Sequence, residues 1–333
     1  MYGSDADVDL PVKPILSLIG VYIVLAPLPL LVGEYYTHIL TISCYYIVLA
    51  ASWNLLAGYT GQFSLAHHAF AALGGYTSAL LVIHLEIPML LGICVGGVVS
   101  MTLGYLLGTL CLRMRAIYLA LATWAFAESL RLVIGLEYQI TRGDLGLTTR
   151  LFFRTPFATP YFYLFLFLTM GSLLIMHKIV RSRIGYYMRA IRDDEEAALT
   201  MGVDTVKWKR FVFAVSSLFA GVAGGFYGHY IGLLSPASMK FNEMAIIIIM
   251  VIIGGLRSFA GPIIGAIFIE VTSELLREYG EVRMVLFALL VIVIMRVNRE
   301  GMMGMLQHVY KAFLDKRAAN SSLPLEGGGP TRG

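Results

Sequence analysis

The sequence predicts an all-α integral membrane protein, a polytopic bundle of about 8–10 transmembrane helices interrupted by glycine-rich helix breaks. The 333-residue chain is 58% hydrophobic and has a mean hydropathy of +0.76. Only 14% of its residues are charged, whereas soluble domains are about 25% charged. Apolar runs long enough to cross a bilayer recur along the chain. These observations argue against a soluble enzyme, a disordered chain and, despite 34 glycines, a collagen-like chain.

The individual spans follow from length, because a membrane helix needs about 20 mostly apolar residues. Ten segments meet or approach this requirement: 15–33, 37–57, 63–83, 88–112, 116–135, 160–177, 210–233, 243–256, 259–276 and 283–297. His67 and His68 weaken 63–83, and the segments 243–256 and 283–297 are short enough to be partial or re-entrant.

The orientation is predicted from basic residues, because Lys and Arg concentrate in cytoplasmic loops. With the N-terminus inside, alternation places most of the 25 Lys and Arg residues on the inner side, the largest share in one loop. We expect a cytoplasmic N-terminus over 1–14, a transmembrane domain over 15–299 with a cytoplasmic loop at 178–209, and a flexible cytoplasmic tail over 300–333. The acidic start of the chain argues against a cleaved secretory signal.

Several chemistries are not expected. Cys44, Cys94 and Cys111 lie inside apolar runs without CxxC spacing. We therefore expect these cysteines to be small, buried hydrophobic residues that form no metal site. The P-loop pattern needs a Gly-Lys pair, and no lysine follows a glycine, so an ATPase is not recognisable. A net charge of +4 does not indicate nucleic acid. We therefore expect no cofactor and no catalytic residue in this chain.

The basic loop contains Glu196-Ala197-Ala198 followed by Gly202, a pattern that suits a short helix with a glycine C-cap. The acidic residues from 193 to 196 place negative charge near its first turn. Small alanines permit close approach of a partner. From these residues alone, a solvated charged loop is an equally good interpretation.

The same loop resembles the EAA loop of ABC importer permeases, a coupling helix that docks on a separate ATP-binding subunit. The resemblance implies docking roles for Arg189, Arg192, Glu196, Ala197, Ala198 and Gly202. The usual I-x-L-P sequence beyond the glycine is not found.

A second block, Trp53–Thr77, looks like the N-L-x-x-G-Y-T-G-Q-x-S-L-G-H-x-A-F block of branched-chain amino acid ABC permeases, in particular their M-type (LivM-like) subunit. Further matching blocks follow in order over about 40–300: Thr141–Thr148, Phe219–Gly225 and Val251–Pro262. Ala66 and Arg257 stand where this family usually has glycine, and Asn298-Arg-Glu-Gly301 lacks a customary proline. These three departures concern the shapes of local turns more than the resemblance to the family.

The resemblance implies an importer subunit for branched-chain or other hydrophobic amino acids in the inner (plasma) membrane, with both termini inside. Related permeases carry urea or short amides. The implied partners are two ATP-binding subunits, which would hold ATP and Mg²⁺, a homologous second permease, and a periplasmic or extracellular substrate-binding protein. Two rivals remain open: a proton- or sodium-coupled secondary transporter, with an intramembrane carboxylate or histidine as coupling group, and a membrane-embedded enzyme or channel.

Two glycine-rich breaks are candidates for the translocation pathway. Gly58 to Gly75 bracket the first, and Gly254 to Pro262 form the second. Irregular backbone at membrane depth must be buried in protein or line a cavity, and broken helices often bind the charged ends of zwitterions. The alternative is close helix packing through small residues, which we favour for Gly221, Gly224 and Gly225.

Polar residues inside the spans also have two interpretations. Those near the first break either line the pathway or satisfy freed backbone groups. Glu128 and Arg131, at i and i+3, are expected to form an ion pair that faces the bundle or a cavity. The candidate pathway residues are Asn54, Gly58, Gly61, Gln62, His67, Glu128, Arg131, Gly254 and Gly255.

Overall fold

The computed structural model describes residues 22, 25–111, 114, 116–153, 155, 157–280, 282–297 and 301–305. The expected cytoplasmic N-terminus 1–14, residues 15–21, 23 and 24 of the candidate span 15–33, and the tail beyond 305 lie outside these residues. Within the segment expected to be a flexible tail, residues 301–305 are helical.

The described chain is almost entirely helical, which confirms the all-α prediction. Its helices are α2 (Leu28–Leu31), α3 (Glu34–Thr60), α4 (His67–His84), α5 (Met89–Cys111), α6 (Ala116–Leu136), α7 (Tyr138–Thr141), α8 (Thr159–Arg181), α9 (Arg183–Asp193), α10 (Glu195–Thr200), α11 (Thr205–Ile231), α12 (Phe241–Gly254), α13 (Gly261–Leu275) and α14 (Val282–Val297). Short 3-10 turns are η1 (Gly143–Leu145), η2 (Pro236–Met239) and η3 (Arg277–Tyr279). Strands β1 (Leu147–Thr148) and β2 (Leu233–Leu234) pair antiparallel.

Each predicted span from 37–57 onward coincides with one of these helices to within a few residues. The largest shift is in α11, which begins at Thr205 rather than at 210, inside the predicted loop. The reason is a helix cap: the Asp204 carboxylate accepts a hydrogen bond from the Lys207 backbone N–H at 2.9 Å. Five helices of the described chain, α3, α5, α6, α8 and α11, are long and apolar enough to cross a membrane, and α12 is a shorter apolar helix.

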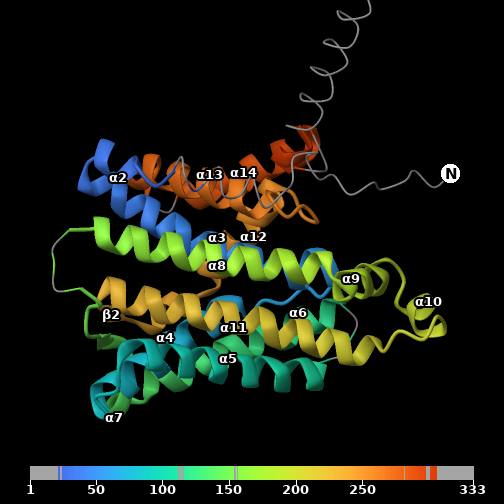
Figure 1. The fold of residues 1–333 in the computed structure, drawn as a ribbon, viewed down its shortest axis with the longest axis horizontal. Coiled ribbons are helices and arrows are strands. Elements are labelled where there is room, and N and C mark those ends of the chain that lie inside the picture. The colour runs from blue at the N-terminus through green and yellow to red at the C-terminus, as the bar shows by residue number, and fades with distance from the viewer. Residues whose placement is uncertain are drawn as a thin grey trace, which may run out of the picture.

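Helix α11 lies at the centre of the bundle and packs against α5, α4 and α3 (Figure 1). Small residues allow this close approach: a Cβ added to Gly74 would lie 2.1 Å from the carbonyl oxygen of Gly221, and one added to Gly225 would lie 3.1 Å from Ile93. The predicted packing role of the α11 glycines is therefore confirmed. Gly74 and Gly75 lie inside α4, so the prediction of irregular backbone up to residue 75 was too long.

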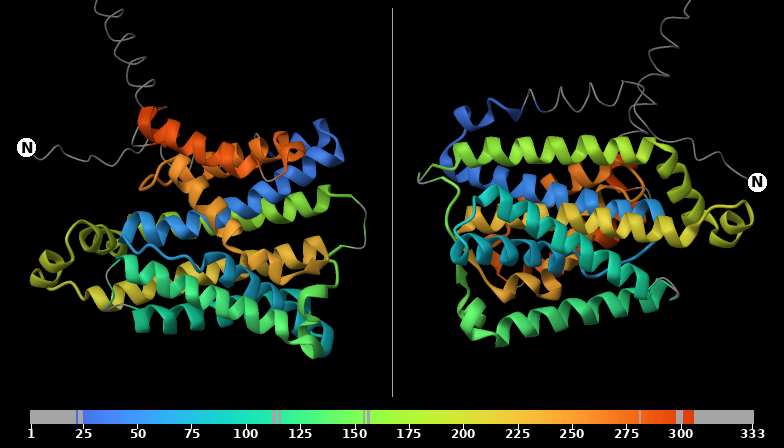
Figure 2. Two further views of the ribbon diagram at one scale, coloured as in Figure 1. Left: turned by 180° about the vertical axis from the view of Figure 1, so that it is seen from behind. Right: turned by 60° about the horizontal axis from the view of Figure 1, so that its bottom comes forward.

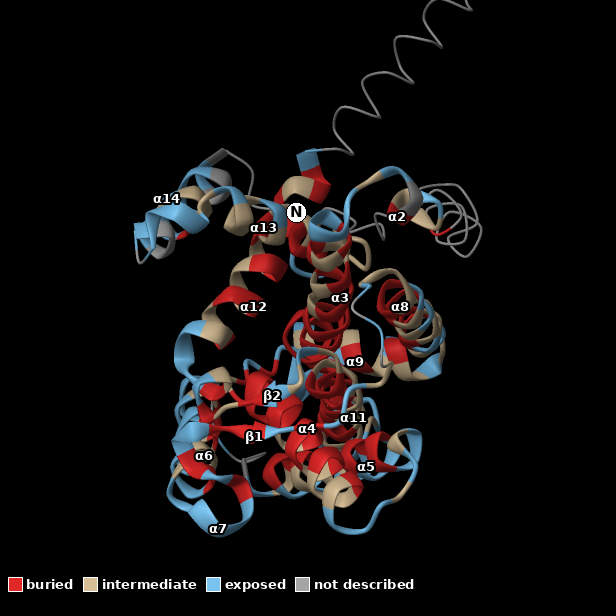
Figure 3. Cartoon of the chain, turned by 90° about the vertical axis from the view of Figure 1, so that its left-hand side faces the viewer, coloured by how far each residue is buried: buried red, intermediate tan, exposed pale blue. Residues whose placement is uncertain are grey.

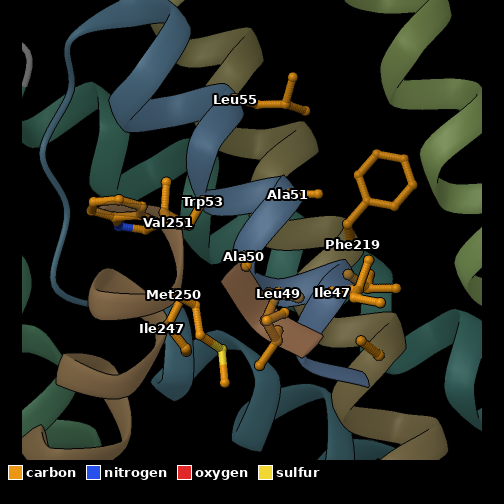
Figure 4. Close-up of a cluster of buried hydrophobic side chains, with 14 of the residues drawn as sticks. Ile47, Leu49, Ala50, Ala51, Trp53, Leu55, Phe219, Ile247, Met250 and Val251 are labelled. Carbon is orange, nitrogen blue, oxygen red and sulfur yellow. The ribbon is translucent and has the colours of Figure 1, made fainter. Parts of the chain in front are cut away.

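Helices α12, α13 and α14 form a second layer over α3. Helices α12 and α13 pack on each other and on α3, and α14 packs on α12 (Figure 2). A buried apolar core joins the layers, in which Leu49 and Trp53 of α3 lie near Met250 and Val251 of α12 (Figure 4). Phe219 of α11 lies on the other side of α3, beside Ala51. Helix α3 thus belongs to both layers.

The molecule has two distinct ends. Helices α9 and α10 lie at one end, the α10 end, and the β1–β2 ribbon with α7 lies at the opposite end, the ribbon end (Figure 1). Viewed along this axis, α3, α4 and α11 are mostly buried, whereas α6 and α7 are exposed at the rim (Figure 3). Cys44 is buried as expected, but Cys94 is exposed, because it lies on the outer face of α5.

Candidate functional site

The predicted helix in the basic loop is present as α10. Its N-cap is Asp194, whose carboxylate accepts a hydrogen bond from the Ala197 backbone N–H at 3.0 Å. At the other end, Gly202 has φ +84°, and the Val203 N–H donates to the Ala198 carbonyl at 3.0 Å. This six-to-one hydrogen bond is the Schellman C-cap that the sequence predicts.

The segment before α10 is folded against the bundle. In α9, Met188 and Ile191 are buried, and Tyr187 stacks on Trp208 of α11 with ring centroids 5.2 Å apart. Glu195 forms an ion pair with Lys209 of α11 at 2.5 Å. These contacts fix the loop in place, which argues against the interpretation as a loosely solvated charged segment.

The face of α10 that points away from the bundle is mixed. Glu196 and Ala197 are exposed, and Ala198 is buried against the bundle. Leu199 is 51% exposed and Met201 is 84% exposed. Sequence reasoning missed Leu199 and Met201, although large apolar residues inside a polar loop were a signal for an exposed contact surface.

The two arginines of α9 have different environments. The Arg189 guanidinium lies over the Tyr186 ring, 4.8 Å from its centroid. The Arg192 side chain is only 15% exposed. Its guanidinium donates to the Gly58 carbonyl at 3.2 Å and pairs with Asp193 at 2.9 Å. Arg192 therefore points toward α3, away from the exposed face of α10.

The first break separates α3 from α4. Helix α3 ends at Thr60, and Gly61 follows with φ +71°. The irregular segment to residue 66 is held by two side chains: the Trp53 indole donates to the Ser64 carbonyl at 2.8 Å, and the Thr123 hydroxyl accepts from the Leu65 N–H at 2.9 Å. Gln62, Ser64 and Ala66 are buried, whereas Gly61 and Phe63 are exposed, so this break is only partly buried within the chain.

The polar side chains at the first break point in different directions. His67 hydrogen-bonds through Nε2 to the Ser52 hydroxyl at 2.8 Å, and His68 through Nε2 to the Met239 carbonyl at 2.7 Å. Gln62 is buried, and its Oε1 has no hydrogen-bond partner among the described residues. The two histidines are therefore held by different partners, His67 by α3 and His68 by η2.

The second break follows α12. Helix α12 ends at Gly254, Gly255 has φ +121°, and α13 begins at Gly261. Asn54 of α3 reaches this break: its Nδ2 donates to the Ser258 carbonyl at 2.9 Å, and its Oδ1 accepts from the Arg257 N–H at 3.4 Å. Asn54 thus satisfies freed backbone groups, one of the two roles expected for it.

The predicted ion pair is formed on α6. Both carboxylate oxygens of Glu128 accept from Arg131 Nε at 3.0 Å. The Glu128 and Arg131 side chains are 38% and 23% exposed. The structure therefore places this pair on the poorly buried helix α6, whereas Asn54, Gly58 and Gly61 lie in or next to the last turns of α3.

Comparison with known proteins decides the family. A family model described as the permease component of branched-chain amino acid transport systems matches residues 35–295. The chain belongs to this permease family. It is similar to the high-affinity branched-chain amino acid transport system permease protein LivM of Salmonella typhimurium (29% identical over 88% of this chain and 76% of that protein) and of Escherichia coli (28%, with the same coverage). It is also similar to a probable branched-chain amino acid transport permease LivH of Methanocaldococcus jannaschii (29% identical over 70% of this chain and 77% of that protein). No solved structure matches.

One departure from the family motif is resolved by the structure of this permease. Arg257, at a usual glycine position, has φ +77°, a left-handed conformation that glycine adopts without strain. The turn that glycine would form is therefore retained with an arginine, held by the hydrogen bond from the Arg257 N–H to Asn54.

Proposed function

We propose that this chain is the M-type permease subunit of an ABC importer that carries branched-chain or other hydrophobic amino acids across the inner, or plasma, membrane. The observation that carries the proposal is the family match over residues 35–295, taken with an ordered and exposed α10. ATP and Mg²⁺ would be bound by two separate ATP-binding subunits. No substrate bond is broken, so the proposal includes no catalytic residue in this chain.

The α10 end is the proposed docking surface for an ATP-binding subunit. Leu199 and Met201 offer apolar contacts, and Glu196, Ala197 and Gly202 lie on the same exposed segment. The basic residues of this loop favour its cytoplasmic placement, which gives N-in and C-in termini. The substrate-binding protein would then approach the ribbon end.

The proposed site for the homologous second permease is the exposed side of α6. Only 22% of the apolar window of α6 is buried within this chain, the smallest share among the five long spans. The Glu128–Arg131 ion pair lies on this incompletely covered helix, and a charged pair facing lipid is costly. A partner protein or a water-filled pathway on this side would remove that cost.

In the proposed mechanism, ATP-driven closure of the ATP-binding subunits moves α9 and α10, and the bundle switches between inward-facing and outward-facing states. The candidate pathway remains the two helix breaks, through Asn54, Gly58, Gly61, Gln62, His67, Gly254 and Gly255, together with Glu128 and Arg131.

Copurification tests the class of transporter. The chain is coexpressed with its candidate ATP-binding and second permease subunits and isolated through a tag on this chain. Gly202→Asp and Glu196→Lys should each release the ATPase. Gly202→Asn is the matched control, because asparagine tolerates φ +84° and adds no charge. If the ATPase stays bound to both charged variants, α10 is not part of the docking surface.

Uptake into proteoliposomes tests the energy source and substrate. We expect uptake of labelled leucine that requires ATP and the loaded binding protein and persists in the presence of a protonophore. Uptake that proceeds without ATP and collapses with the proton gradient would overturn the ABC assignment in favour of a secondary transporter. Uptake of labelled urea or acetamide without leucine would reassign the substrate and keep the class.

A further inference from the structure

We infer that Arg192 is a positioning residue that ties the coupling segment α9–α10 to both helix breaks, through the last turn of α3 and Asn54. This inference rests on the proposed function as an ATP-driven permease. It changes the expectation for Arg192, which the resemblance placed among the docking residues.

The first link joins Arg192 to the end of α3. The last four carbonyls of a helix lack donors from within the helix, and Gly58 carries one of them. Arg192 donates to this carbonyl at 3.2 Å, and a cation at a helix C-terminus is electrostatically favourable. A Cβ added to Gly61 would lie 3.4 Å from Arg192 Cγ, so the arginine stem also packs on the first break. Arg192 thus holds α3 at the point where the helix stops.

The second link joins the same turn of α3 to the second break. Asn54 precedes Gly58 by one helical turn and binds both the Arg257 N–H and the Ser258 carbonyl. A Cβ on Gly58 would lie 2.0 Å from Asn54 Oδ1 and 3.2 Å from the Arg257 nitrogen. Gly58 is therefore the point at which Arg192, Asn54 and the second break meet.

The third link fixes Arg192 to the coupling segment. Ile191 beside it is buried, and Asp193 pairs with its guanidinium at 2.9 Å. Helix α9 packs on α10, α11 and α3. A displacement of α9 is therefore carried into the last turn of α3, because Arg192 is held on both sides and has little free space. The two breaks, far apart in sequence, then move together.

Transport and ATP hydrolysis, both measured on the complete reconstituted importer, distinguish this positioning role from a docking role. We expect Arg192→Ala to retain the ATPase in the complex and to hydrolyse ATP, with substrate transported per ATP lowered about tenfold, within the usual range of coupling between sites. Asn54→Ala should likewise keep ATP hydrolysis and lower the substrate transported per ATP. The double variant should transport no less per ATP than either single variant, because the effects of residues that act as one unit are not additive. Arg183→Ala, an exposed residue at the start of the same helix, is the matched control.

Hydrogen exchange gives a second readout on the purified complex. Arg192→Ala should speed exchange at 255–260, which Arg192 is linked to through Gly58 and Asn54 of α3, whereas Arg183→Ala should leave it unchanged. Loss of the bound ATPase in Arg192→Ala would make Arg192 a docking residue and overturn the inference. Faster exchange confined to the end of α3, with transport per ATP intact, would reduce Arg192 to a helix cap and also overturn it. A wild-type chain that binds no ATPase would instead contradict the proposed function.

Discussion

Gly224 of α11 faces the backbone of Ala71 in α4 so closely that a Cβ on Gly224 would lie 1.8 Å from the Ala71 carbonyl oxygen. Real Cβ atoms are essentially never found so close to a backbone atom. Because the neighbouring atoms belong to the backbone of α4, a side chain at Gly224 would force the two helices apart. The central helices therefore touch through backbone at this point.

We expect Gly224→Ala to destabilise the protein strongly, by about 1–3 kcal/mol, the usual range for overpacking. Gly171→Ala in α8 is the control, because nothing lies within 4 Å of its Cβ position and alanine favours a helix over glycine. Thermal unfolding of the detergent-purified variants measures the difference. Equal melting temperatures would show that α4 and α11 are not packed this closely.

A second prediction concerns the left-handed Arg257. Replacing it by glycine should stabilise the protein by about 1 kcal/mol relative to Arg257→Ala, because a side chain at positive φ costs about 1–2 kcal/mol. Both variants remove the arginine side chain, so their comparison isolates the backbone strain. Thermal unfolding in the same detergent checks it, and an alanine variant at least as stable as the glycine variant would contradict φ +77° at this position.

The exposed apolar residues of α10 give a third prediction. Leu199→Glu and Met201→Glu should each reduce the amount of copurified ATP-binding subunit about tenfold or more, as expected when an interface anchor is lost. Leu145→Glu, 72% exposed at the ribbon end, is the control and should have no effect. Full retention of the ATPase by both variants would show that the partner docks elsewhere.

Substitutions in the ion pair on α6 distinguish an ATP-driven permease from a proton-coupled secondary transporter. Under the proposed function, uptake by Glu128→Gln should still require ATP, and its thermal stability should be lower, because Arg131 loses its partner. The double variant Glu128→Gln with Arg131→Met should recover stability, since it leaves no unpaired charge. Uptake that loses its proton dependence in Glu128→Gln would instead identify this carboxylate as a coupling group.

The helix positions could be predicted from the sequence because each span is an uninterrupted apolar run. The second break was likewise predictable, because proline is favoured in the first turn of a helix and glycine just after its last turn. The early start of α11 was missed because Lys207, Lys209 and Arg210 interrupt its first turns, so the continuous apolar run begins only after them. Its signal, an aspartate three residues before Lys207, is common in loops.

The site was less predictable because its contacts join segments far apart in the chain. Gly74 and Gly58 have the same residue type, yet Gly74 packs a helix against α11, whereas Gly58 lies between Asn54 and the second break. Nothing in the local sequence distinguishes them. For the same reason, the inward direction of Arg192 could not be read from a loop whose charges all look solvated.

Helix α11 is held at each extremity by a different part of the chain: Lys209 pairs with Glu195 near one terminus, and the strand directly after the other terminus pairs Leu234 with Leu147. Its 27 residues run without interruption, a length of about 40 Å. One continuous rod thus joins the two faces of the protein. The length of this helix is therefore close to the full thickness of a bilayer, about 40–45 Å.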